Sequence, residues 1–147
     1  MSLFLSSYEN RIDAKGRISV PASFRATLNN DKFAGVVLYR SFTHNCIEGL
    51  SMSRMESLAS ATDKMGVFDN ALDDLSALLF ADARPLLFDV AGRIVIPNDL
   101  LKHAGISDSA LFVGRGNSFQ IWNPDEFRKA QEKSLENLRA TRPNLII

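Results

Sequence analysis

The chain has 147 residues, of which 46% are hydrophobic and 23% are charged, and these proportions exclude disorder along its whole length. Its longest apolar runs are too short to span a membrane, and its first residues contain no charged leader, so we expect a soluble cytoplasmic protein. Seventeen basic residues balance seventeen acidic ones, and the single cysteine, Cys46, excludes an internal disulfide and a cysteine-rich zinc site.

A nine-residue motif occurs twice in the chain. The first copy, residues 13–21, reads Asp-Ala-Lys-Gly-Arg-Ile-Ser-Val-Pro, and the second, residues 89–97, reads Asp-Val-Ala-Gly-Arg-Ile-Val-Ile-Pro. The Asp, Gly, Arg, Ile and Pro are identical in the two copies, and the segments that follow them are similar in character. The chain is therefore predicted to contain two copies of one small unit.

Each copy of the motif is typical of a β-hairpin that leads through a short strand into a helix. Asp13 and Asp89 are expected to open turns, because an Asp side chain can accept a backbone N–H two residues further on. Gly16 and Gly92 supply the positive φ that a short hairpin loop needs. The strands that follow alternate between apolar and polar residues, and the proline at the end of each motif suits a first helical turn.

Two further strands are predicted to close each unit, at about residues 35–40 and 46–50 in the first and 110–115 and 118–122 in the second. The chain then divides into four parts. These are a first repeat (1–50), a helical insert (51–85), a second repeat (86–127), and a C-terminal helix with a short tail (128–147).

The insert is predicted to form two helices. Ser53 with Glu56 has the spacing of a capping box at the start of the first helix. Asp69 or Asn70 can cap the second helix, and the pair Arg84-Pro85 is expected to end it.

The C-terminal segment has the clearest helix start in the chain. Asn123 is the expected N-cap and Pro124 the first helical residue, while Asp125 and Glu126 complement the helix dipole. Pro143 is expected to stop this helix.

The arginine of each motif, Arg17 or Arg93, has two interpretations. In the structural one, Asp13 pins the turn and Arg17 forms a salt bridge back to it or to a neighbouring chain. In the functional one, the guanidinium donates two hydrogen bonds to phosphate or guanine. An arginine repeated on two rigid hairpins would suit a polyanion, whose charges also repeat. Lys15 adds a second cation to the first hairpin, where the second copy has Ala91, so the first repeat is the better candidate for a contact surface.

Charge is weakly segregated along the chain. Residues 1–25 carry four cations against two carboxylates, whereas residues 51–88 carry three cations against six carboxylates. Arg11 and Arg25 either widen a basic patch around the first hairpin or are solvated surface charges. Any DNA binding would have to use this local patch, because the whole chain is neutral.

The paired hairpins Asp13–Arg17 and Asp89–Arg93, each followed by Ile-x-Val/Ile-Pro and a short helix, resemble those of the MraZ family. This resemblance implies an α+β fold of two tandem AbrB-like swapped-hairpin units in a pseudo-twofold β-barrel, with a helical insert and a C-terminal helix. It also implies a sequence-specific transcriptional regulator that binds tandem short G-rich repeats in double-stranded DNA upstream of the division and cell-wall gene cluster.

The resemblance further implies a homo-oligomeric ring that is associated with the nucleoid and needs no cofactor. The family's DNA-contacting positions map onto Lys15, Gly16 and Arg17 in the first motif and onto Arg93 in the second. Arg11 is a further candidate, whereas Asp13, Asp89 and Gly92 are expected to shape the turns.

An enzyme is the first alternative, and its candidate residues are few. His44 and His103 are the only histidines. Neither has a Ser, Cys or carboxylate at a sequence spacing that would indicate a catalytic pair or triad. His44 with Cys46 offers two potential ligands, too few for zinc. We therefore expect no catalytic residues and no metal.

An oligomeric scaffold or an RNA-binding module is the second alternative. Single-stranded RNA would call for exposed aromatic side chains, but Phe24, Phe112 and Phe119 fall on apolar faces at core spacing. A pure scaffold would not need the cations Lys15 and Arg17.

Overall fold

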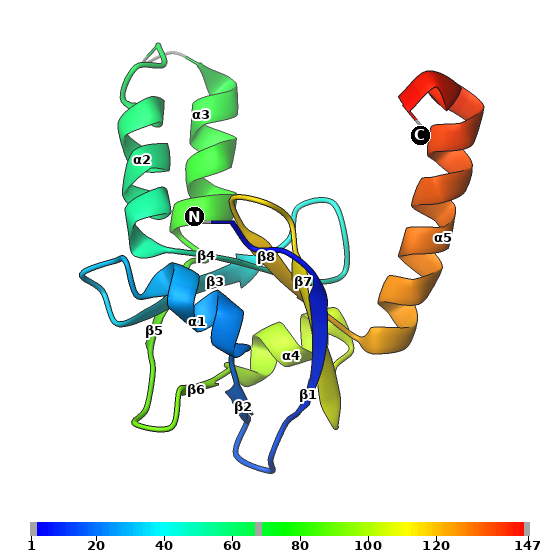
Figure 1. The fold of residues 1–147 in the computed structure, drawn as a ribbon. Coiled ribbons are helices and arrows are strands. Elements are labelled where there is room, and N and C mark those ends of the chain that lie inside the picture. The colour runs from blue at the N-terminus through cyan, green and yellow to red at the C-terminus, as the bar shows by residue number, and fades with distance from the viewer. Residues whose placement is uncertain (1–2, 67–68, 146–147) are drawn as a thin grey trace.

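The computed structural model describes residues 3–66 and 69–145, and its strands form two antiparallel sheets in a mixed α+β fold (Figure 1). The first repeat contributes β1 (Ser7–Arg11), β2 (Arg17–Ser19), α1 (Ala22–Leu28), β3 (Gly35–Arg40) and β4 (Ile47–Leu50). The second contributes β5 (Arg84–Leu87), β6 (Arg93–Val95), α4 (Asn98–Ala104), β7 (Ser109–Gly114) and β8 (Phe119–Trp122). The remaining elements are α2 (Met52–Thr62), α3 (Asn70–Leu75), the π-helical turn η1 (Ser76–Phe80), α5 (Pro124–Thr141) and the 3-10 turn η2 (Pro143–Leu145).

The two repeats exchange strands with each other. The larger sheet has the order β1-β7-β8-β4-β3-β5, so β1 of the first repeat pairs with the second repeat and β5 of the second pairs with the first. The smaller sheet consists of β2 and β6, again one strand from each repeat. If each strand is replaced by its counterpart in the other repeat, the strand order becomes the same list read from β5 to β1. The repeats therefore fold together and share one core.

The prediction of a closed β-barrel is wrong for the part of the chain that the structure describes. There, β1 and β5 are the two edges of the larger sheet and do not pair with each other. The physical reason is that the chain turns sharply after each edge strand, at the Asp-x-x-Gly loops. The next strands, β2 and β6, then pair as a separate ribbon instead of extending the sheet to closure.

The core confirms the alternation that the motifs predict. Ile18 and Ile94 lie at the centre of β2 and β6 and are each only 1% exposed, whereas the residues beside them reach the surface. Phe24, Phe112 and Phe119 are fully buried and pack edge-on or tilted against one another. Burial of three phenylalanines and two isoleucines, at about 1.5–3 kcal/mol for each side chain, ties the ribbon to the larger sheet.

The two helices of the insert are confirmed, but their boundaries differ from the prediction. The N-cap of α2 is Ser51, whose side chain accepts the N–H of Arg54 at 3.0 Å, and not Ser53. The helix starts early because β4 ends at Leu50, directly before this serine. Asp69 caps α3 as expected and accepts the N–H of Ala71 at 2.9 Å.

The pair Arg84-Pro85 does not end the second helix, as the sequence suggested. The helical segment has already ended at its C-cap Ala81, and both residues belong to β5. A proline is tolerated there because β5 is an edge strand, where one N–H is not needed for pairing.

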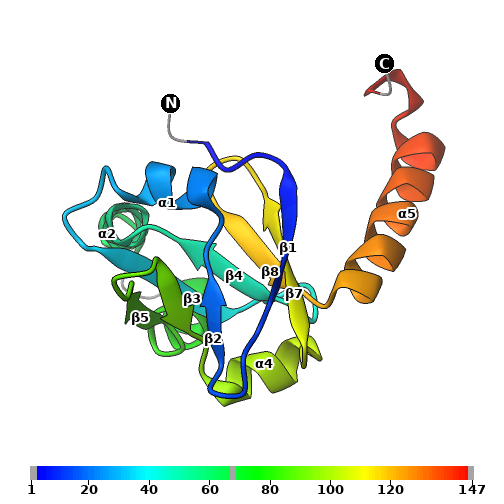
Figure 2. The same ribbon diagram turned by 60° about the horizontal axis from the view of Figure 1, so that its bottom comes forward.

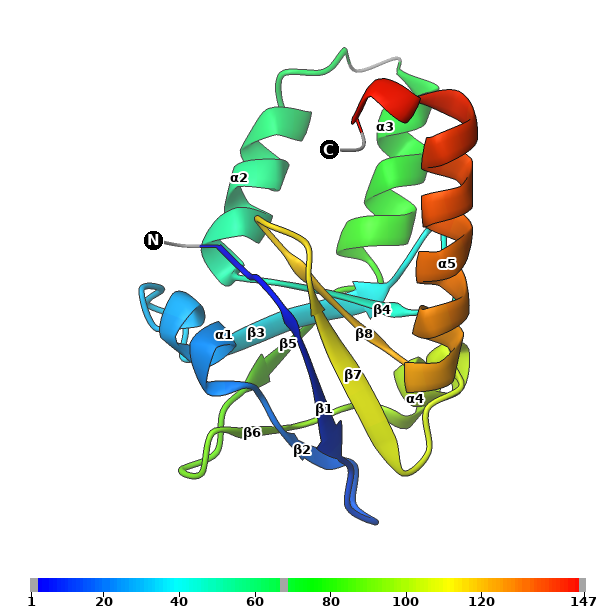
Figure 3. The same cartoon turned by 45° about the vertical axis from the view of Figure 1, so that its right-hand side comes forward.

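The C-terminal helix α5 begins as predicted, with Asn123 accepting the N–H groups of Asp125 and Glu126. Phe127 and Ala130 pack near Trp122, but no residue of α5 is fully buried. Beyond this contact the helix extends away from the sheets (Figures 1 and 2). Figure 3 shows the Asp-x-x-Gly loops at one end of the molecule and the pair α2 and α3 at the other.

Candidate nucleic-acid interface

The first loop is held by a single aspartate. One carboxylate oxygen of Asp13, Oδ1, accepts the N–H groups of Lys15 and Arg17, each at 2.9 Å. The carbonyl of the same residue accepts the N–H of Gly16, whose φ is +81°. These three hydrogen bonds hold the loop through its own residues, without a bound ligand.

The second loop repeats this arrangement atom by atom. Oδ1 of Asp89 accepts the N–H groups of Ala91 and Arg93 at 2.9 Å, and its carbonyl accepts the N–H of Gly92, whose φ is +77°. The N–H of Arg93, with its side chain, holds the pKa of Asp89 below its ordinary value, as those of Arg17 do for Asp13. Both carboxylates are therefore negative at neutral pH.

Each aspartate also orients the arginine of its motif. The Nε of Arg17 lies 2.6 Å from Oδ2 of Asp13, and the Nε of Arg93 lies 2.8 Å from Oδ2 of Asp89. Both arginine side chains are 36% exposed. Within the residues described here, the terminal nitrogens Nη1 and Nη2 of these arginines make no hydrogen bond. The salt bridge thus holds one edge of each guanidinium and leaves the outer edge available to a ligand.

The β2–β6 ribbon brings the two arginines onto one surface. Arg17 pairs with Val95, and Ser19 pairs with Arg93, while Ile18 and Ile94 pair on the buried face. Directly opposite residues of an antiparallel pair share a face, as do residues two apart on one strand. Arg17 and Arg93 are therefore diagonal neighbours, about 7–8 Å apart, on the outer face of the ribbon. We call this the arginine face, made of Arg17, Ser19, Arg93 and Val95.

Backbone bonds between the repeats lock the loops to the ribbon. The carbonyl of Gly16 accepts the N–H of Ile96 at 3.0 Å, and the carbonyl of Gly92 accepts the N–H of Val20 at 3.2 Å. A Cβ on Gly16 would lie 3.1 Å from the carbonyl oxygen of Ile96. The first glycine is therefore required both for its positive φ and for this close approach.

The other predicted cations lie at different places. Lys15 is exposed at the tip of the first loop, and Arg11 is exposed at the end of β1, opposite Ser109. Arg25, which the sequence left open between two roles, is half-buried: its Nε donates to the carbonyl of Val20 at 3.0 Å, and its guanidinium packs against Gly92. Arg25 thus supports the second loop from the first repeat, a role that no sequence signal indicated.

Two of the residues considered for catalysis, His44 and Cys46, pack within the fold. His44 packs against Trp122, with ring centroids 5.5 Å apart. Burial raises the pKa of the Cys46 thiol to about 12, so it carries no thiolate at neutral pH. In the two described ranges, no three His, Cys, Asp or Glu side chains are grouped so as to hold a metal ion. No helix there is both long and apolar enough to cross a membrane.

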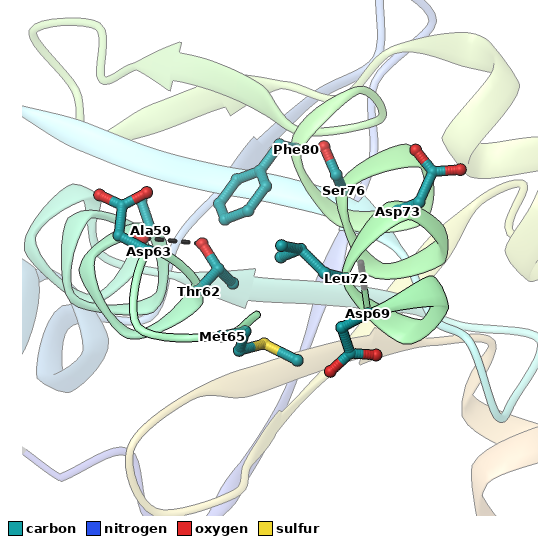
Figure 4. Close-up of a pocket in the computed structure, with 9 residues that line it drawn as sticks. All are labelled: Ala59, Thr62, Asp63, Met65, Asp69, Leu72, Asp73, Ser76 and Phe80. Carbon is teal, nitrogen blue, oxygen red and sulfur yellow. Dashed lines mark hydrogen bonds between the residues drawn. The ribbon is translucent and has the colours of Figure 1, made fainter. Parts of the chain in front are cut away.

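A cavity of about 580 Å³ lies between α2 and α3, at the end of the molecule remote from the arginine face (Figures 3 and 4). It combines an apolar floor with three aspartates, Asp63, Asp69 and Asp73, and none of the described residues that line it is a cation. Its charge is the wrong sign for a nucleic acid.

The fold and the paired loops define a class: an α+β protein in which two copies of one motif, residues 13–21 and 89–97, pair as a ribbon and share a two-arginine surface. The sequence matches the family described as "MraZ protein, putative antitoxin-like" over residues 3–75 and 79–145. The chain belongs to the MraZ family.

Named relatives agree with this assignment over nearly the whole chain. A protein of Pelagibacter ubique is 43% identical over 97% of this chain and 92% of its own length. One of Gluconobacter oxydans is 44% identical over 97% and 90%, and one of Rickettsia peacockii is 41% identical over 98% and 99%. Each relative is named "Transcriptional regulator MraZ". The resemblance stated from the motifs is confirmed, and this regulatory name agrees with the expectation that the chain is not an enzyme.

Proposed function

We propose that this protein is a DNA-binding transcriptional regulator that contacts double-stranded DNA with its arginine face. The observation that carries the proposal is the shared geometry of Arg17 and Arg93. Each is held through Nε by its own aspartate, and each directs its outer edge from the same side of the ribbon. The regulatory name of the relatives supports the same assignment.

The outer edge of a guanidinium is suited to DNA because its two terminal nitrogens can donate to the O6 and N7 atoms of one guanine or to phosphate oxygens. Prior fixation by Asp13 or Asp89 lowers the entropy lost on binding. Lys15 at the loop tip supplies a phosphate contact, Gly16 allows close approach of the backbone, and Arg11, exposed at the end of β1, supplies a further phosphate contact.

A single arginine face is small, and the chain as a whole is neutral. Strong binding therefore needs several faces acting together, which a homo-oligomeric ring supplies through its effective concentration. Tandem short G-rich repeats, upstream of the division and cell-wall gene cluster, are the matching form of DNA. Such a ring would lie in the cytoplasm and associate with the nucleoid.

The exchange of β1, β5 and the β2–β6 ribbon between the repeats supports placing the fold among the AbrB-like swapped-hairpin proteins. In this arrangement neither motif can form its ribbon alone. The four parts proposed from the sequence, 1–50, 51–85, 86–127 and 128–147, then act as two interlocked binding repeats with two helical additions.

The test is a fluorescence anisotropy titration at two salt concentrations. The probes are the promoter fragment upstream of the protein's own gene and a scrambled fragment of equal length. The variants are Arg17→Ala and, as a matched control, Arg54→Ala, which removes an exposed arginine from α2 at the opposite end of the molecule.

We expect tighter binding to the promoter fragment, weakened about 10- to 100-fold by Arg17→Ala, since a good bidentate contact contributes about 1–3 kcal/mol. The Arg54→Ala variant should bind as the wild type does. Equal binding of both fragments, or equal loss in the two variants while circular dichroism shows folded protein, would overturn the proposal and favour the scaffold or RNA-binding alternative.

A further inference from the structure

Within the residues that the structure describes, the C-terminal helix contacts the sheets mainly through its first two turns. At 18 residues α5 is about 27 Å long, and its contacts to the sheets involve Phe127 and Ala130 near its start. Leu135 in its second half is 41% exposed, and Leu145 beyond the helix is 65% exposed. Apolar side chains held out in solvent on a long helix indicate a surface for another molecule.

The second half of α5 carries this apolar surface beside two cations. Leu135, Leu138 and Arg139 follow the spacing i, i+3, i+4, so they share one face of the helix, and Arg142 follows as the C-cap residue. We call them the distal face of α5. Neither arginine forms an ion pair with any residue in the described part of the chain, and the face therefore combines leucines with unneutralised positive charge.

The cavity between α2 and α3 has complementary properties. Met65, Leu72 and Phe80 supply its apolar surface (Figure 4). Asp63, Asp69 and Asp73 surround it, and within residues 3–66 and 69–145 none of the three forms an ion pair. We call this cavity, with its three carboxylates, the acidic groove.

We propose that the distal face of α5 from one copy docks in the acidic groove of a neighbouring copy. The proposal deepens the proposed function, because it rests on the ring assembly and names the surfaces that join its subunits. The leucines cover the apolar residues of the groove, while Arg139 and Arg142 approach carboxylates that have no other cationic partner. Partial desolvation strengthens these pairs relative to exposed ones.

The arrangement of the elements fits a contact between copies. In one chain α5 stands well apart from α2 and α3, so the helix does not fill its own groove (Figures 1 and 2). Helix and groove are different surfaces, which makes the contact heterologous, and heterologous contacts close into rings when the rotation allows it. Both surfaces lie away from the Asp-x-x-Gly loops (Figure 3). Side-by-side docking therefore leaves every arginine face free and directed to the same side.

Charge reversal tests this pairing without removing a core residue. The two test variants of the full chain are Asp73→Arg in the groove and Arg139→Glu on the distal face. The matched controls are Asp74→Arg, next to the groove but not part of its lining, and Lys133→Glu, on the opposite side of α5. The measurement is molar mass by size-exclusion chromatography with light scattering, for each variant alone and for an equimolar mixture of the two test variants.

The wild type and both controls should form the same oligomer, and each test variant alone should shift to monomers or smaller species. The mixture should recover the oligomer, because every interface in an alternating ring then pairs opposite charges. At one interface the two substituted side chains meet with their charges exchanged, and at the next the unchanged Asp73 meets the unchanged Arg139.

An unaltered oligomer in either test variant, a mixture that stays dissociated, or a monomeric wild type would overturn this contact. Titration of a single-repeat DNA probe with Arg17→Ala reports on DNA binding separately, since one face suffices for that probe. Failure of the docking contact is therefore distinguishable from failure of the proposed function.

Discussion

The two Asp-x-x-Gly-Arg loops have the same backbone and different surfaces. Oδ1 of each aspartate accepts two N–H groups at 2.9 Å, and each glycine has a φ near +80°. The tips differ, because the first presents Lys15 and the second presents Val90 and Ala91. The identical residues of the motif therefore set the loop and orient the arginine, whereas the variable residues set the charge at the tip of each loop.

Replacing the two loop glycines should disturb the backbone conformation that the loops share more than any other change considered. Gly16→Ala and Gly92→Ala would each place a Cβ on a residue with positive φ, and the Cβ would press on the carbonyl of Ile96 in the first variant and on the side chain of Arg25 in the second. We expect each variant to lower the free energy of unfolding by about 1–3 kcal/mol, measured by chemical denaturation. Gly105→Ala is a control for strain alone, because its Cβ would meet no atom within 4 Å. Wild-type stability in the Gly16 variant would contradict this account of the loop.

A smaller change tests the orientation of the arginines. Lysine keeps the positive charge, but its ammonium group has no planar guanidinium. It therefore cannot donate to the aspartate with one edge and make two parallel hydrogen bonds to DNA with the other. We therefore expect Arg17→Lys and Arg93→Lys to weaken promoter binding about tenfold each, with little change in salt dependence. Anisotropy titration checks this, and full affinity in both lysine variants would show that charge alone is sufficient.

The tips can be made equal by exchanging their variable residue. Lys15→Ala should weaken DNA binding a few-fold and reduce the slope of log affinity against log salt by about one. Ala91→Lys should do the opposite, because it gives the second loop the cation of the first. If Ala91→Lys left both affinity and slope unchanged, the second loop would lie away from the DNA.

The smallest expected effect is the pH dependence of stability that the loops share. The N–H and side chain of Arg17 lower the pKa of Asp13 below its ordinary value of 3.8, and those of Arg93 do the same for Asp89. A lowered folded-state pKa gives a stabilisation that is complete above the unfolded pKa and is lost as the pH falls through the folded pKa. Replacing both aspartates by Asn should therefore flatten the fall in melting temperature below about pH 4, and an unchanged acid profile would exclude this role.

Local features of the loops and helices could be predicted from the sequence because they depend on residues close together in the chain. Asp13 and Gly16 define the first turn within four residues, and Asn123 with Pro124 defines the start of α5. The predicted Ser53 cap is wrong although Ser53 alone has a glutamate three residues later, because β4 ends at Leu50 and the helix begins directly after Ser51.

The composite surface could not be predicted, because it depends on pairing between residues far apart in sequence. β2 and β6 are three residues long, and nothing in either specifies the other as its partner or sets the register that makes Arg17 and Arg93 neighbours. The support of Gly92 by Arg25 has the same origin. The predicted barrel failed for this reason too, since closure depends on which strands lie at the edges.

We propose that arginines from both halves of the ribbon form one contact with DNA. The most direct test of this proposal is a titration of a single-repeat promoter probe with the wild type, Arg17→Ala, Arg93→Ala and the double variant. We predict that each single variant binds more weakly than the wild type and that the double variant binds more weakly than either. Wild-type affinity in Arg93→Ala, with Arg17→Ala alone losing affinity, would contradict the composite surface and leave the first loop as the sole contact.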